Sequence, residues 1–167
     1  KIIRWIACIV VTILLTEFIL NFVIINANIP SGSMENTIMT NDKLIALRTS
    51  YWFNDPKRGD IIIFKYPDDE TEWFIKRVIA LPGETVLVKD GKVYINGSKK
   101  ALSEPYIKEE PVEDFGPYKV PKNGYFVMGD NRNNSNDARE WETHYVSRDE
   151  VLGKAWFRYY PSIKVIK

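Results

Sequence analysis

The sequence of 167 residues is poor in the side chains that form disulfides and bind metal ions. It contains one cysteine, Cys8, and one histidine, His144. A single cysteine excludes an intrachain disulfide, and the two residues together fall short of a structural zinc site. No spacing of carboxylates indicates another site, so we expect no bound metal ion.

An excess of either charge is also missing. The chain has 23 Lys and Arg against 22 Asp and Glu, a formal net charge of +1 at pH 7. A domain that binds nucleic acid usually carries a clustered basic excess. We therefore expect no nucleic-acid partner.

Long apolar runs are absent except for one near the N-terminus. Trp5 to Ile25 are 21 mostly apolar residues, and as a helix they would cover roughly 30 Å, the thickness of a bilayer's hydrocarbon core. Lys1 and Arg4 precede this run, and no comparable basic flank follows it. The positive-inside tendency then predicts a cytoplasmic N-terminus and places the rest of the chain outside.

A cleavable leader is the alternative to a permanent anchor. Leaders end in a small-x-small cleavage site, which Asn26-Ala27-Asn28 does not provide. We therefore interpret residues 1–26 as a single-pass helical anchor in the cell membrane, and residues 27–167 as one extracytoplasmic domain.

Alternating and β-branched residues dominate after the apolar run, and no further long helical period occurs. Pro82-Gly83, Asp90-Gly91 and Asn96-Gly97 are turn signals between these runs. The pattern predicts a mainly β, antiparallel domain on one helical stalk. The predicted strands are 43–48, 60–66, 73–80, 85–89, 92–95, 124–128 and 153–160. We expect a surface loop over 103–122 and one capped helical turn over 147–150.

A serine-containing stretch, Pro30 to Met39, follows the apolar run directly. Ser31 and Ser33 flank a glycine there, which suggests one hydroxyl as a nucleophile and the other as an oxyanion donor. A serine hydroxyl is a weak nucleophile until a neighbouring base takes its proton. His144 lies in a polar stretch without an evident tie to the serines, and we interpret it as a structural or solvated residue.

A lysine is the other candidate base. Lys76 lies between Phe74 and Val78 on one face of the predicted strand 73–80. Burial among apolar side chains lowers the pKa of a lysine and permits it to act as a neutral base. Alone, Lys76 would pass for an ordinary strand residue that points to solvent.

Four sequence blocks, in this order after an apolar anchor, resemble the bacterial type I signal peptidases, and the resemblance spans about residues 10–160. The blocks are Ser31-Gly32-Ser33-Met34, Arg58-Gly59-Asp60-Ile61-Ile62-Ile63-Phe64, Lys76-Arg77-Val78-Ile79 with Leu81-Pro82-Gly83, and Gly129 to Arg139. Asn36 stands where the family commonly has proline, and Ala138 where it often has serine; neither change removes a group from the mechanism.

The resemblance implies a serine-lysine dyad with Ser33 as nucleophile and Lys76 as general base. It implies that the Ser31 hydroxyl and the Ser33 backbone N–H form the oxyanion hole, and that Ser135 orients the Lys76 amine. Further supporting residues are Gly129, which allows a close approach to Lys76, and Asp137 and Arg139, which form an ion pair. The family's apolar subsites fall at positions that would equally pass for core: Ile29, Met34, Ile38, Phe74 and Ile75.

The implied function is cleavage of signal peptides from exported pre-proteins, after small residues and without a cofactor. Two alternatives stay open: a dedicated peptidase of pilin-type precursors, and a catalytically silent, membrane-tethered β domain that binds exported chains. The aromatic trio Tyr51-Trp52-Phe53 is a candidate contact with the lipid headgroups of the bilayer, or a part of the core.

Overall fold

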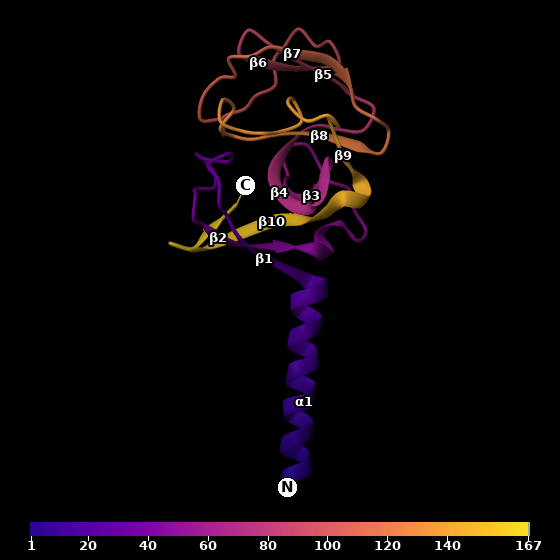
Figure 1. Cartoon of the computed structure of the whole chain (residues 1–167), viewed down its shortest axis with the longest axis vertical. Helices are drawn as coiled ribbons and strands as arrows, with labels where there is room; N and C mark the ends of the chain where they lie inside the picture. The colour runs from indigo at the N-terminus through magenta and orange to yellow at the C-terminus, as the bar shows by residue number, and fades with distance from the viewer. Residues whose placement is uncertain (167) are drawn as a thin grey trace.

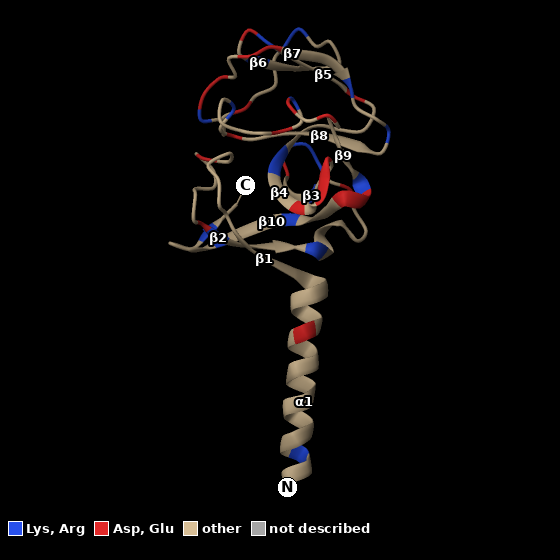
Figure 2. Cartoon of the chain, viewed as in Figure 1, with Lys and Arg blue, Asp and Glu red and all other residues tan. Residues whose placement is uncertain are grey.

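The structure is a computed structural model, and residues 1–166 are described. A helix, α1 (Ile2–Phe18), continues through one π-helical turn (Ile19–Val23) and projects from the β domain as a stalk (Figure 1). No glycine or proline interrupts this segment, and none of its side chains is buried inside the chain. Charged residues are rare along it (Figure 2). Within the described residues, Ile2–Val23 is the one helix long and apolar enough to cross a membrane.

The helix ends earlier than predicted, because Ile24 and Ile25 belong to a strand. This strand, β1 (Ile24–Asn28), pairs with β2 (Lys43–Leu47) in antiparallel register from Ile24 opposite Leu47 to Asn28 opposite Lys43. Ile25 is only 5% exposed and packs in the domain core. A short apolar stretch that prolongs a helical run has no period of its own, so β1 has no signal in the sequence. The stalk therefore enters the sheet directly.

The main sheet has eight strands in the order β1-β2-β10-β3-β4-β8-β9, with β11 paired to β10. Every strand pair described in both sheets is antiparallel, as predicted. The strands not yet given are β3 (Ile61–Tyr66), β4 (Asp69–Ala80), β8 (Gly124–Met128), β9 (Val146–Ser147), β10 (Val151–Tyr160) and β11 (Lys164–Val165). Lys76 lies in β4 of this sheet, and β1 leads into the segment that contains Ser33.

A second sheet lies at the end of the molecule farthest from α1 (Figure 1). Its strand order is β6-β5-β7, with β5 at Thr85–Lys89, β6 at Lys92–Ile95 and β7 at Phe115–Lys119. The prediction of one loop over 103–122 was wrong, because β7 lies inside it. Gly116 and Pro117 mask the strand in the sequence, yet an edge strand such as β7 tolerates both.

Two short helical turns bear on the predictions. The predicted turn after Ser147 is present as a 3-10 turn (Arg148–Glu150), and Ser147 and Glu150 form its capping box. A second 3-10 turn (Arg48–Tyr51) buries Tyr51, whose hydroxyl donates to Asp60, so this member of the aromatic trio is a core residue. Trp52 and Phe53 are 53% and 91% exposed.

The core consists of two clusters, and β4 contributes to both. Phe74 and Val78 contact one cluster, while Ile75 packs against the other. The second cluster includes Met34 and Ile38 from the serine-containing stretch. The neighbours of Ser33 and of Lys76 in the sequence are therefore both packed in the core.

Candidate active site

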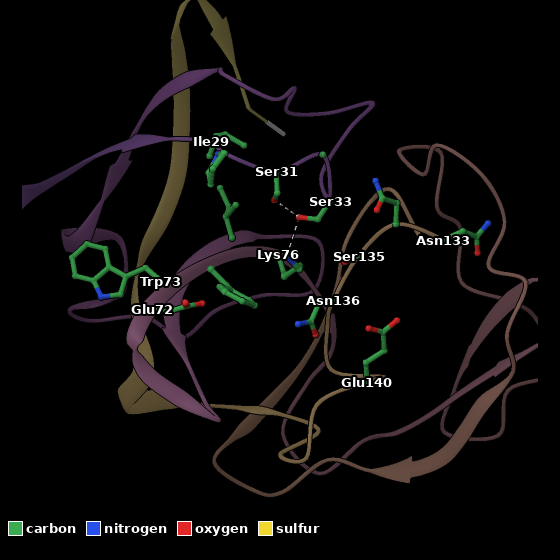
Figure 3. A pocket seen from close by; sticks show the side chains of 15 residues that line it. Ile29, Ser31, Ser33, Glu72, Trp73, Lys76, Asn133, Ser135, Asn136 and Glu140 are labelled. Carbon is green, nitrogen blue, oxygen red and sulfur yellow. Dashed lines mark hydrogen bonds between the residues drawn. The ribbon is translucent and has the colours of Figure 1, made fainter.

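The structure brings the two residues of the candidate dyad into direct contact. Lys76 Nζ lies 2.9 Å from Ser33 Oγ, and the two residues are 4% and 6% exposed (Figure 3). Ser31 Oγ lies 3.4 Å from Ser33 Oγ on the side facing away from the lysine. A neutral amine at this distance can accept the serine proton. Residues 43 positions apart in the sequence are thus in direct contact.

Burial sets the protonation state of the lysine. Desolvation lowers the pKa of Lys76 from 10.5 to about 8, and the nearby negative charge of Asp137 opposes this effect. At pH 7 roughly one lysine in ten is then neutral, against about 0.04% at an ordinary pKa of about 10.4. The site therefore holds a usable fraction of the base without needing a histidine.

The loop after β8 is hydrogen-bonded to the serine-containing stretch. The backbone N–H of Asn131 donates to the Ser33 carbonyl at 3.0 Å, and Asn131 Nδ2 donates to the Gly32 carbonyl at 3.0 Å. A side chain at Gly129 would place its Cβ 2.2 Å from Ser135 Oγ and 2.4 Å from the Ser33 carbonyl oxygen. Gly129 thus allows a close approach of the backbone to Ser33 and Ser135, and its approach to Lys76 stays a prediction.

Asp137 and Arg139 form the predicted ion pair. Arg139 Nε donates to Asp137 Oδ1 at 2.9 Å, and the side chains are 9% and 0% exposed. Asp137 Oδ2 also accepts the Gly129 N–H at 2.9 Å, and Arg139 Nη2 donates to the Arg132 carbonyl. The pair therefore fixes the loop that approaches Ser33.

A cleft of about 740 Å³ opens over the dyad. Ile29, Phe74 and Ile75, predicted as apolar subsites, line it. Met34 and Ile38 do not line it, because they are 0% and 1% exposed and packed in the core. The prediction that these two residues meet a substrate was wrong, and their alternative reading as core residues holds.

Comparison with known proteins identifies the family. A family described as signal peptidase, peptidase S26, matches residues 2–160. A probable signal peptidase I-2 of Synechocystis sp. is 44% identical over 161 residues, covering 93% of this chain and 72% of the relative. Signal peptidase I T of Bacillus subtilis is 37% identical over 168 residues, covering 95% of this chain and 85% of the relative.

A solved structure agrees with these sequences. The crystal structure of a signal peptidase I from Enterococcus faecalis is 36% identical, has a TM-score of 0.52, and covers 60% of this chain and 97% of that one. The chain belongs to the peptidase S26 family of signal peptidases. The enzyme is accordingly a serine endopeptidase, and its substrates carry signal peptides.

Ser135 is buried beside the dyad in this enzyme and lines the cleft. Its Oγ has no hydrogen-bond partner among the described residues, so it makes no direct bond to Lys76 here. An orienting role for Ser135 stays a prediction.

Sequence reasoning missed a buried ion pair beside the dyad. Arg77 donates to both carboxylate oxygens of Asp130, at 2.8 and 2.7 Å, and the side chains are 3% and 0% exposed. Asp130 also accepts a hydrogen bond from the Thr37 hydroxyl, and Arg77 Nη1 donates to the Gly59 carbonyl at 2.8 Å. The sequence did carry a signal, because an arginine followed by the apolar residues Val78, Ile79 and Ala80 of a strand requires a partner when buried.

His144 takes no part in this arrangement. Its Nδ1 lies 2.8 Å from the Ala138 carbonyl, and its ring packs edge-on against Phe115 and Tyr118. These contacts favour the structural interpretation of His144 over the solvated one, and the residue is not among those that line the cleft.

Proposed function

We propose that the enzyme removes N-terminal signal peptides from exported pre-proteins through a dyad of Ser33 and Lys76. One observation carries the proposal: a buried lysine amine in hydrogen-bonding contact with a serine hydroxyl, at the floor of an open cleft. A binding module has no need of a desolvated lysine, which stands against the silent β domain.

The reaction proceeds in two stages. Neutral Lys76 takes the Ser33 proton as the hydroxyl oxygen attacks the scissile carbonyl, and the resulting ammonium protonates the leaving amine. The Ser31 hydroxyl and the Ser33 N–H stabilise the negative charge on the tetrahedral intermediate. Water, deprotonated by Lys76, then hydrolyses the acyl-enzyme. Every step uses groups of the protein and water, so the chemistry requires no cofactor.

The substrate would lie extended between the segment around Ile29 and strand β4. Ile29, Phe74 and Ile75 offer shallow apolar contacts for small residues at the first and third positions before the cut. Phe74 is held in place by stacking on Tyr66, with ring centroids 4.5 Å apart. A rigid, shallow wall of this kind favours small side chains over large ones.

The membrane is the second partner in this proposal. The α1 stalk would span the bilayer with a cytoplasmic N-terminus, which leaves the catalytic domain outside. Trp52 and Phe53 are exposed and directly follow the 3-10 turn Arg48–Tyr51, which contacts the last turn of the stalk and β1. Both rings would enter the headgroup region. If serine at both positions leaves liposome binding of the anchor-free domain unchanged, this contact is wrong.

Cleavage of several unrelated precursors tests the function. Purified full-length enzyme in detergent is expected to cut each precursor once, after a small residue, as mapped by mass spectrometry of both products. Activity confined to one pilin-type precursor would favour the dedicated peptidase. Binding of precursors without cleavage would favour the silent domain.

A further inference from the structure

The cleft over the dyad has two chemically different arms. One, the apolar arm, is formed by Ile29, Trp73, Phe74 and Ile75; the other, the polar arm, is formed by residues 133–136 and Glu140. In Figure 3, Ile29 and Trp73 lie on one side of Ser33 and Lys76, while Asn133 and Glu140 lie on the other. The proposed function uses only the apolar arm.

The polar arm offers unused hydrogen-bonding groups. The side chains of Asn134 and Asn136 are exposed, and neither makes a hydrogen bond to any described residue. The buried hydroxyl of Ser135 between them also lacks a partner. Amides and a hydroxyl in a row suit the backbone of an extended polypeptide, whose N–H and C=O groups need partners on leaving water.

Glu140 gives this arm a negative charge. It is exposed and forms no ion pair within the described part of the chain, because the adjacent Arg139 is engaged by Asp137 and by the Arg132 carbonyl. Lys76 is the one basic residue among those lining the cleft, and it is buried. The carboxylate therefore faces the cleft without a neutralising cation.

A smaller hollow of about 400 Å³ continues the polar arm, sharing Asn136 and Glu140 with it. Asp68 and Glu142 line this hollow. Desolvation acts to raise the pKa of Asp68, but hydrogen bonds from Thr143 N, Glu142 N and Tyr66 Oη hold it below its usual value. Trp141 also lines it, and its buried Nε1–H has no partner. The acidic character thus extends outward from Glu140.

We propose that the polar arm binds the first residues after the cut, and that Glu140 favours precursors with a basic residue there. This inference rests on the proposed function. The scissile carbonyl must lie at Ser33 Oγ, and residues before the cut occupy the apolar arm. An extended chain that passes Ser33 then enters the polar arm, where backbone groups meet the asparagines and a lysine or arginine meets Glu140.

This inference is tested with peptide precursors that have the same sequence up to the cut. The second, third and fourth residues after the cut are each changed to Lys, Gln or Glu, and kcat/KM is measured with the full chain in detergent. For at least one position we expect the Lys peptide to exceed the Glu peptide by about two- to fivefold, the range of an exposed ion pair. The preference should shrink in 1 M salt.

Charge variants separate a contact from a structural effect. Glu140→Gln is expected to bring the Lys-to-Glu ratio close to one, and Glu140→Lys to invert it. Glu72→Gln is the matched control, because Glu72 lines the same cleft beside Trp73 at the outer end of the apolar arm, and it should keep the ratio of the wild type. Glu113→Gln, on an exposed loop outside the cleft, should leave both the ratio and the rate unchanged.

The outcomes distinguish the two proposals. If the wild type cleaves all peptides and the ratio is the same in Glu140→Lys at every position, the inference is overturned and the proposed function stands. If the wild type cleaves none of them faster than Ser33→Ala does, the proposed function fails, and the inference fails with it.

Discussion

At the scale of single residues, the environment of Lys76 decides whether the enzyme has a base. Its pKa of about 8 results from burial, since the charge of Asp137 acts in the opposite direction. We expect kcat/KM to rise about tenfold per pH unit below pH 8 and to level off above it. The measurement is peptide cleavage from pH 5.5 to 9.5. A plateau that continues below pH 6 would contradict the assignment of Lys76 as base.

The same burial means that Lys76 destabilises the folded state. Below pH 8 the lysine is protonated in the folded and the unfolded chain, so the full cost of burying its charge is present. The gap between about 8 and 10.5 corresponds to about 3 kcal/mol. As pH rises from 8 to 10.5 the folded state loses the proton first, and stability recovers.

Lys76→Met is therefore expected to raise the free energy of unfolding at pH 7 by up to about 3 kcal/mol while abolishing activity. Its advantage over the wild type should fall as pH approaches 10.5. Urea unfolding of both proteins across this pH range measures the difference. A variant that is less stable than wild type at pH 7 would show that the buried amine does not carry this cost.

Residue chemistry was the most predictable part of the site. Ser33 follows an apolar run and stands next but one to another serine, and Lys76 lies among apolar residues of a strand. Alone, Lys76 resembles an ordinary strand residue, and its pairing with Ser33 is implied by the resemblance to the signal peptidases. Met34 and Ile38 were indistinguishable from cleft residues in the sequence, since an apolar side chain looks the same whether a cleft or the core lies above it. Only the packing separates them from Ile29 and Ile75.

At the scale of elements, the buried pair of Arg77 and Asp130 ties β4 to the loop after β8, and Thr37 joins the serine segment to it. Asp130→Asn preserves shape but leaves the arginine charge buried without its counter-ion. We expect a loss of about 3–5 kcal/mol of stability and a strong loss of activity. Chemical unfolding and peptide cleavage measure both.

The exposed pair Lys65–Glu70 provides the matched comparison, with side chains 40% and 63% exposed. Glu70→Gln removes one acidic partner in the same way and should change stability by less than about 1 kcal/mol. Equal effects of the two substitutions would contradict the claim that burial gives the Arg77–Asp130 pair its importance.

Strands were predictable where side chains alternate or β-branched residues cluster, as in β3, β5 and β8. They were missed where another rule dominated. β1 continues a helical apolar run, β7 contains Gly116 and Pro117, and β9 is only two residues long. These strands form through pairing with neighbours that are distant in sequence, which local propensity does not reveal.

At the scale of the whole molecule, the junction between stalk and sheet fixes where the domain begins. β1 is the edge strand that follows the stalk, and it contributes the buried Ile25. A chain that begins at Ile24 is expected to keep its fold and to cleave short peptides, whereas one that begins at Ile29 loses β1. The second chain should be less stable by more than about 3 kcal/mol, since truncating one buried isoleucine alone costs about 2–5 kcal/mol.

Thermal unfolding by circular dichroism compares the two truncated chains. Equal stability of the two chains would mean that β1 does not stabilise the catalytic domain. β1 would then be part of the anchor, in line with the predicted boundary after residue 26. The anchor-free chain can also be tested on membrane-inserted precursors. If it cleaves them at the rate of the full chain, the stalk does not help to deliver substrate.

The central claim is that Ser33 is the nucleophile and Lys76 its base, and the most direct test is cleavage of one signal-peptide substrate in detergent by wild type, Ser33→Ala and Lys76→Ala. General-base catalysis alone contributes about 10²- to 10⁴-fold, so we expect each variant to stay folded and to lose at least about a hundredfold in kcat/KM. Full activity in either variant would contradict it.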